Sequence, residues 1–144
     1  MRRFAFVIGV VATAMLVVGA CRDGGVVPRQ MVVGGNPANG PRVLAVYGCG
    51  SCHVIPGVRT ATGRVGPPLT DFADRGYIAG RVRNEPNALV SWIREPQATD
   101  PETVMPNLGV PDRDARDMAA YLYTLSSDPL GPPHVISPRV LPSH

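Results

Sequence analysis

The chain has 144 residues, enough for one domain, and its 44% hydrophobic and 17% charged content is typical of a globular protein. Its formal net charge at pH 7 is +3, and Arg2 and Arg3 account for two of these charges. The remaining balance excludes a strongly basic nucleic-acid-binding surface, so we expect no nucleic-acid partner.

The first 21 residues have the pattern of an export signal. Arg2 and Arg3 precede an apolar run from Phe4 to Val18, and small residues separate this run from Cys21. The end of the stretch, VGAC, resembles the bacterial lipobox, in which the cysteine is acylated and becomes the mature N-terminus. We expect a signal peptide over residues 1–20 and a lipid anchor on Cys21. An uncleaved membrane helix and cleavage to a soluble protein are the alternatives, and all three place the domain outside the cytoplasm.

Segments rich in Gly and Pro flank a single predicted head. Residues 22–41 carry no sustained helical or alternating pattern, which predicts a flexible linker. Residues 128–144 are rich in proline and should form an extended tail. The head therefore spans residues 42–127, a size at which a metal or cofactor often supplements the core.

Three helices are predicted in the head, over residues 42–50, 85–95 and 112–126. Asn84 is a candidate N-cap for the second helix, which must stop by Pro96. Apolar residues recur at helical spacing in the second helix at Leu89, Trp92 and Ile93 and in the third at Met118, Tyr121, Leu122 and Leu125. Because nothing resembles a βαβ unit, the predicted class is all-α with long Gly/Pro-rich loops.

The stretch YGCGSCH, residues 47–53, holds two of the three cysteines and one of the three histidines. A redox dithiol would need a Cys-x-x-Cys pair at the start of a helix after a strand, and here the predicted helix comes before it. Structural zinc needs four ligands, and no second pair is available. Haem attachment needs two cysteines three positions apart and an adjacent histidine, namely Cys49, Cys52 and His53. Haem attachment is therefore favoured, with the dithiol as the alternative.

Met105 is the favoured second axial ligand of such a haem. It lies in the loop between the second and third helices, where Pro101 and Pro106 stiffen the chain. Met118 falls on the apolar stripe of the last helix and is predicted to be core. His134 and His144 remain alternatives in the proline-rich tail.

The chain resembles the small monohaem class I cytochromes c over residues 42–127. The matching pieces occur in family order: the short helix into CGSCH, GPPL at residues 66–69, ADR at residues 73–75, residues 88–106 and residues 114–125. The resemblance implies a cytochrome c-like fold, with small helices wrapped around one covalently bound haem c. It also implies His53 and Met105 as the axial ligands.

Further site roles are implied by the same resemblance. The carbonyl of Pro67 would accept a hydrogen bond from the His53 ring. Arg75 and Thr103 would lie near a haem propionate, and Trp92 would lie beside the Met105 ligand. Tyr121 would pack on the first helix.

The expected function is electron transfer by a membrane-tethered carrier that performs no bond chemistry, because His/Met ligation leaves no open position on the iron. The expected partners are redox proteins, such as a terminal oxidase or a quinol- or substrate-oxidising complex. A haem catalyst or sensor with an open or labile sixth position is the alternative function.

Overall fold

Four α-helices, two 3₁₀ turns and one hairpin make up residues 30–128, the part of the chain that the computed structural model describes. In chain order they are α1 (Gly40–Val46), η1 (Cys49–Ser51), η2 (Phe72–Asp74), β1 (Tyr77–Ile78), β2 (Val82–Arg83), α2 (Pro86–Arg94), α3 (Pro96–Thr99) and α4 (Asp112–Leu122). The predicted signal, Cys21 and the tail beyond residue 128 lie outside the described residues.

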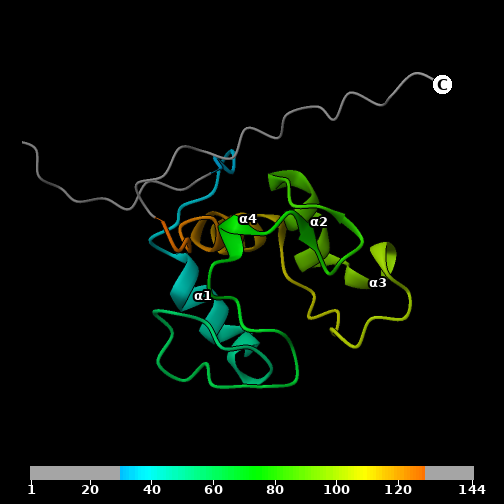
Figure 1. Ribbon diagram of the computed structural model, residues 1–144, viewed down its shortest axis with the longest axis horizontal. Helices are drawn as coiled ribbons and strands as arrows, with labels where there is room; N and C mark the ends of the chain where they lie inside the picture. Colours follow the sequence, from blue (N-terminus) through cyan, green and yellow to red (C-terminus); the bar gives the residue numbers. More distant parts are fainter. Residues whose placement is uncertain (1–29, 129–144) are drawn as a thin grey trace, which may run out of the picture.

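α4 is the helix on which the other main helices pack. Both α1 and α2 contact it, and Figure 1 shows the three helices converging. Ala115, Met118 and Ala119 of α4 are completely buried, which confirms Met118 as a core residue. The core continues into Val43 and Leu44 of α1 and into Leu89, Val90, Trp92 and Ile93 of α2.

α1 and α4 approach closely at Gly40. A Cβ atom added to Gly40 would lie 2.8 Å from the carbonyl oxygen of Asp117 and 2.9 Å from Cγ of Tyr121. Such separations are too short for a real Cβ, so only glycine permits this crossing. Tyr121 therefore lies against the first helix, where the resemblance places it.

Prolines mark the helix boundaries between residues 86 and 96. Pro86 begins α2, a position where its missing N–H costs no hydrogen bond. Pro96 disfavours helical backbone at Glu95, so α2 ends at Arg94 and Pro96 begins the short helix α3. The chain then runs without regular structure to α4.

The described residues are mainly helical, as predicted, but they also contain a two-stranded antiparallel sheet. Tyr77 lies opposite Arg83, and Ile78 lies opposite Val82. The turn between the strands has positive φ angles at Ala79 (50°) and Gly80 (70°), as in tight hairpin turns. Two residues per strand are too few for the period-two pattern that predicts a strand from sequence.

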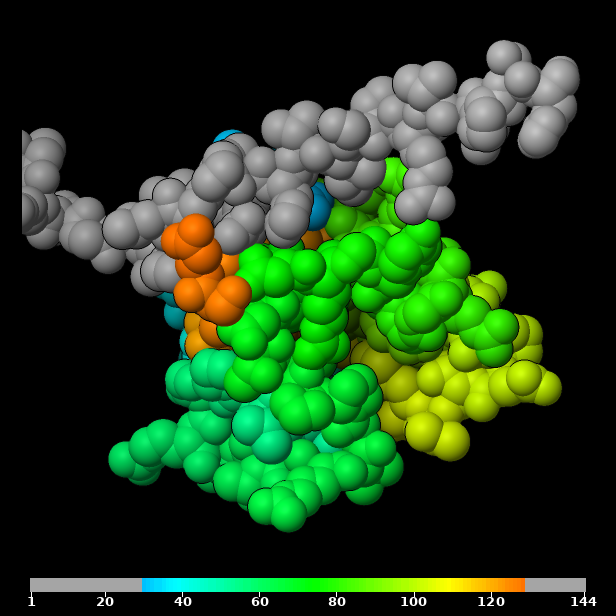
Figure 2. Space-filling view, viewed as in Figure 1, coloured from blue at the N-terminus to red at the C-terminus, as the bar shows by residue number. Residues whose placement is uncertain are grey.

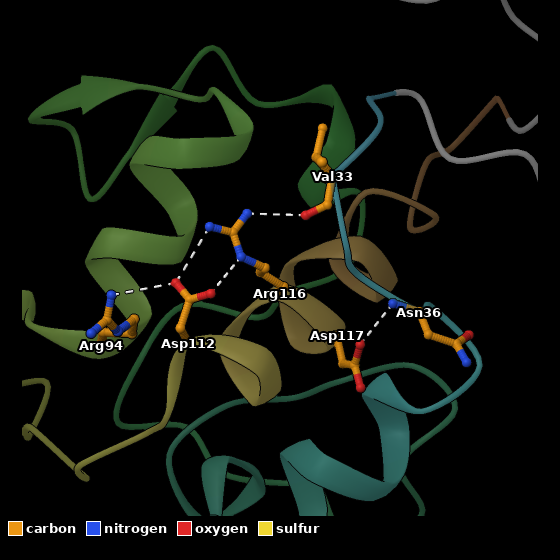
Figure 3. A network of polar contacts seen from close by, with 6 residues as sticks. All are labelled: Val33, Asn36, Arg94, Asp112, Arg116 and Asp117. Carbon is orange, nitrogen blue, oxygen red and sulfur yellow. Dashed lines mark hydrogen bonds and ion pairs between the residues drawn. The ribbon is translucent and has the colours of Figure 1, made fainter.

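The predicted linker over residues 22–41 is wrong for its C-terminal part. Val32 is buried, and residues 33–39 lie along α4. Asp117 accepts hydrogen bonds from the Asn36 N–H at 2.7 Å and from Asn39 Nδ2 at 3.1 Å. Figure 3 shows the neighbouring contacts: Arg116 pairs with Asp112 (2.6 Å) and donates to the Val33 carbonyl (3.0 Å), and Asp112 also pairs with Arg94 (3.4 Å).

Helix ends also differ from the prediction. α1 begins at Gly40 instead of residue 42 and ends at Val46, because Gly48 takes a left-handed φ of 70°. α4 ends at Leu122 instead of residue 126, and beyond it the N–H groups of Thr124 and Leu125 donate three residues back, to the carbonyls of Tyr121 and Leu122. Asn84 does not cap α2, because its side chain bonds to other parts of the fold.

Among the described residues, no helix is both long and apolar enough to span a membrane.

Candidate functional site

Cys49, Cys52 and His53 form one tight turn just after α1. The backbone N–H groups of Cys52 and His53 both donate to the Cys49 carbonyl, at 3.2 and 3.1 Å. Both cysteines are half-buried free thiols. Burial raises the pKa of the Cys49 thiol, which lowers its thiolate fraction.

The His53 ring is oriented by the loop that follows it. Nδ1 of His53 lies 2.7 Å from the carbonyl oxygen of Pro67. Because a carbonyl only accepts, Nδ1 donates the proton and Nε2 keeps its lone pair. The hydrogen bond that the resemblance implies is therefore present, and Nε2 is the nitrogen free to bind a metal.

Gly66 lies directly against the same ring. A Cβ atom on Gly66 would be 2.7 Å from Nδ1 and 2.9 Å from Nε2 of His53. The Gly66 N–H donates to the Cys52 carbonyl at 2.9 Å, which ties the loop to the cysteine turn. The Gly66 backbone thus lies close against the imidazole and limits the movement of the ring.

Met105 is held by both of its backbone groups. Its N–H donates to Oγ1 of Thr103 at 3.3 Å, and its carbonyl accepts from Nε2 of Gln97 in α3 at 2.6 Å. The side chain is half-buried and packs against the hydrophobic core. Thr103 therefore bonds the backbone of Met105 in this structure, and the propionate role implied for it stays a prediction.

Arg75 turns back onto its own loop. Its Nη2 donates to the carbonyls of Pro68 and Thr70, the latter at 3.2 Å, and its guanidinium lies 5.3 Å from the Phe72 ring centre. These contacts place Arg75 beside the segment that carries Pro67. Its implied contact with a haem propionate stays a prediction. Trp92 is buried in α2, and its implied position beside Met105 also stays a prediction.

Two residues at the site were not predicted to serve it. Gln97 anchors Met105 only because α3 turns back toward the loop, and no local pattern indicates such a contact. Asn84 was predicted as a helix cap, but its side chain holds the segment that contains Arg75. Both interactions join residues that are eight or more positions apart.

The side chains suit a covalently attached haem. Two thiols on one turn can form the attachment, an imidazole nitrogen has a free lone pair, and a thioether lies on a separate, tethered loop. In Figure 2 the loop after the cysteines forms the lower end of the molecule, and the segment around Met105 forms the neighbouring flank. Cys21, His134 and His144 lie outside the described residues.

Comparison with known proteins gave one family and two curated relatives. The family model described as cytochrome c matches residues 37–126. Cytochrome c oxidase subunit 2 of Alkalihalophilus pseudofirmus is 38% identical over 88 residues, which cover 61% of this chain and 24% of that protein. Cytochrome c oxidase subunit 2 of Bacillus sp. strain PS3 is 36% identical over 59 residues, which cover 40% of this chain and 17% of that protein. The matched region is thus a quarter or less of each relative, and no solved structure matches.

Proposed function

Because the chain belongs to the cytochrome c family, whose cofactor is covalently attached haem c, we propose that it is a membrane-tethered monohaem electron carrier. The observation that carries this proposal is the His53–Pro67 hydrogen bond of 2.7 Å next to the two cysteines. It leaves the Nε2 lone pair available for iron and fixes the plane of the ring.

In this proposal, two cysteines, one histidine and one methionine of this chain hold the haem. Cys49 and Cys52 would form its two thioether links, and His53 and Met105 would be its iron ligands. The haem supplies one-electron redox chemistry when bound. Pro67 orients His53, while Gln97 and Thr103 hold the backbone of Met105 in place. Arg75 would lie near a haem propionate and Trp92 beside Met105, as the resemblance implies.

The proposed partner is a respiratory complex of the terminal-oxidase type. Support comes from the two relatives, both of them cytochrome c oxidase subunit 2, which match this chain over part of their length. Small, weakly binding docking patches suit the rapid exchange of such partners. The loops on either side of the site, residues 54–64 and 105–110, would supply these patches.

The proposed location is the extracytoplasmic face of a membrane, with Cys21 as a lipid anchor. The pattern of residues 1–21 supports this location. Mass spectrometry of the mature N-terminus tests it. A diacylated Cys21 is expected, whereas an intact Met1 would favour the uncleaved helix and an unmodified N-terminus a soluble protein.

The substitution Met105→Ala tests the ligand assignment. We expect the wild-type oxidised spectrum to show the weak near-infrared band of Met–iron ligation and the variant to lose it. Met118→Ala is the matched control, because Met118 is completely buried in α4 and its loss should lower stability but leave the band intact.

Two results would contradict the carrier proposal. One is a high-spin wild-type spectrum at neutral pH that binds peroxide, CO or NO readily, which would favour the catalyst or sensor alternative. The other is a purified protein whose colour is lost in denaturant, which would exclude covalent haem.

A further inference from the structure

Asn84 is buried and bonded at every polar atom. Only 1% of its surface is exposed, although asparagine is mostly an exposed residue. Its Nδ2 donates to the carbonyls of Phe72 and Arg75, both at 3.0 Å, and its Oδ1 accepts from the Tyr123 hydroxyl at 2.8 Å. Its backbone N–H and carbonyl bond to Gly76 at 3.1 Å and to Gln30 at 3.0 Å. A fully satisfied buried network of this kind fixes the segments that it joins in one arrangement.

The Asn84 side chain joins the turn at residues 72–75 to the end of α4. Tyr123, just after α4, is completely buried, and its ring packs edge-on against Phe72 with centres 6.1 Å apart. Burial raises the pKa of the Tyr123 hydroxyl, so the hydroxyl keeps its proton and donates to Asn84. With Oδ1 so engaged, the amide presents both N–H groups to the turn.

The turn at residues 72–75 also holds the loop that contains Pro67 and orients His53. The carbonyl of Arg75 accepts from Asn84, and the side chain of Arg75 donates to the carbonyls of Pro68 and Thr70. Pro68 directly follows Pro67, whose carbonyl accepts from Nδ1 of His53. A continuous series of contacts therefore connects Tyr123 to the His53 imidazole. It consists of hydrogen bonds through Asn84 and Arg75 and of the peptide bond between Pro67 and Pro68.

We propose that Asn84, oriented by Tyr123, is a positioning residue for His53: it sets the strength of the His53–Pro67 hydrogen bond through Arg75. The inference rests on the proposed function, in which His53 is a haem ligand. A hydrogen bond at Nδ1 makes the imidazole a stronger electron donor, and a stronger donor favours the ferric state. Loosening the network therefore raises the midpoint potential.

Tyr123→Phe and Asn84→Leu test this inference in the holoprotein. The first variant removes only the hydroxyl and keeps the ring packed on Phe72, and the second removes every side-chain hydrogen bond of Asn84. In the ferrous protein, labelled with ¹⁵N, NMR gives the rate at which the Nδ1 proton of His53 exchanges with solvent. We expect roughly tenfold faster exchange in each variant, with an upward shift of the midpoint potential.

Tyr121→Phe is the matched control. It loses a hydroxyl hydrogen bond to a backbone carbonyl, that of Pro56 at 2.6 Å, from the same end of α4, but has no link to Arg75. Its Nδ1 exchange and potential should match the wild type. Amide exchange within α1, measured in the same samples, separates a local effect at His53 from general destabilisation.

A double-mutant cycle with Arg75→Met tests the route. The cycle combines Arg75→Met with Asn84→Leu. If Asn84 acts through Arg75, the double variant should accelerate Nδ1 exchange by less than the product of the two single accelerations. Tyr123→Phe with wild-type exchange and potential, or fully multiplicative effects in the cycle, would overturn the inference. Absence of covalent haem from the wild-type protein would instead overturn the proposed function.

Discussion

At the residue scale, the orientation of His53 depends on two neighbouring residues of one loop. Pro67 supplies the acceptor for Nδ1, and Gly66 lies close against the ring, where a side chain would collide with it. The hydrogen bond leaves Nε2 as the ring nitrogen with a free lone pair. The ring is thus preorganised by a segment more than ten residues further along the chain.

Gly66→Ala should disturb the His53 ring. The added methyl carbon would lie 2.7 Å from Nδ1, so the ring or the loop must move, at a cost of about 1–3 kcal/mol in the free energy of unfolding. We expect a lower yield of low-spin holoprotein and a lower thermal midpoint, measured by visible absorption.

Gly76→Ala is the control for this substitution, because a Cβ at Gly76 would meet nothing within 4 Å. Equal behaviour of the two alanine variants would show that the contact between Gly66 and the ring carries no energetic weight.

At the scale of elements, α4 organises the molecule on more than one side. It contacts α1 and α2, and its charged residues bind the segment before α1. The two acidic residues of α4 in Figure 3 differ in their surroundings. Asp117 is 4% exposed and bonds Asn36 and Asn39, whereas Asp112 is exposed and pairs with Arg116 and Arg94.

Asp117→Ala should therefore release the segment over residues 33–39. Two donors would lose their acceptor, at a cost of about 1–3 kcal/mol in the free energy of unfolding. We expect faster proteolytic cleavage in this segment, mapped by mass spectrometry, together with a lower urea midpoint.

Asp112→Ala is the matched control on the same helix. Its ion pairs lie at the surface, where such pairs add little stability, so cleavage before α1 should stay at the wild-type rate. Rapid cleavage in both variants would indicate that the segment is held by the helix in general and not by Asp117.

At the scale of the whole molecule, the described residues have few long elements around a small core. The longest helix, α4, has 11 residues, and the cysteine loop is held mainly by backbone hydrogen bonds and close packing. Domains of this size often rely on a cofactor for stability. A covalent haem between the cysteine turn and the Met105 loop would join two segments that are more than 50 residues apart in the chain.

The double variant Cys49→Ala, Cys52→Ala should accordingly lose its cooperative fold. Without thioether links the haem would no longer be retained, and the helices would lose their common support. We expect a marked fall in helical circular dichroism and no sigmoidal urea transition.

Ser51→Ala is the control for this double variant. Ser51 lies between the two cysteines and is exposed, and its hydroxyl bonds to the Gly48 carbonyl and weakly to Cys52. This variant should keep both haem and fold. A haem-free cysteine variant with native helicity and a sharp transition would contradict the proposed stabilising role of the cofactor.

Several features could be predicted from the sequence because their causes are local. Cys49, Cys52 and His53 are close in the chain, so one turn must bring them together. The burial of Met118 followed from the period of a helix, and the end of α2 followed from Pro96. Family membership follows from the same ordered motifs, matched over residues 37–126.

Other features were decided only by the tertiary structure. Asn84 precedes a helix, and its local preference predicts a cap, but its amide bonds partners 9, 12 and 39 residues away. Asp117 bonds residues about 80 positions earlier, which is why residues 33–39 belong to the head although their composition predicts a linker. The sequence by itself determined the attachment chemistry, because neighbouring residues carry it. Only the folded chain decided how the His53 ring is held, because hydrogen bonds between distant segments have no local signature.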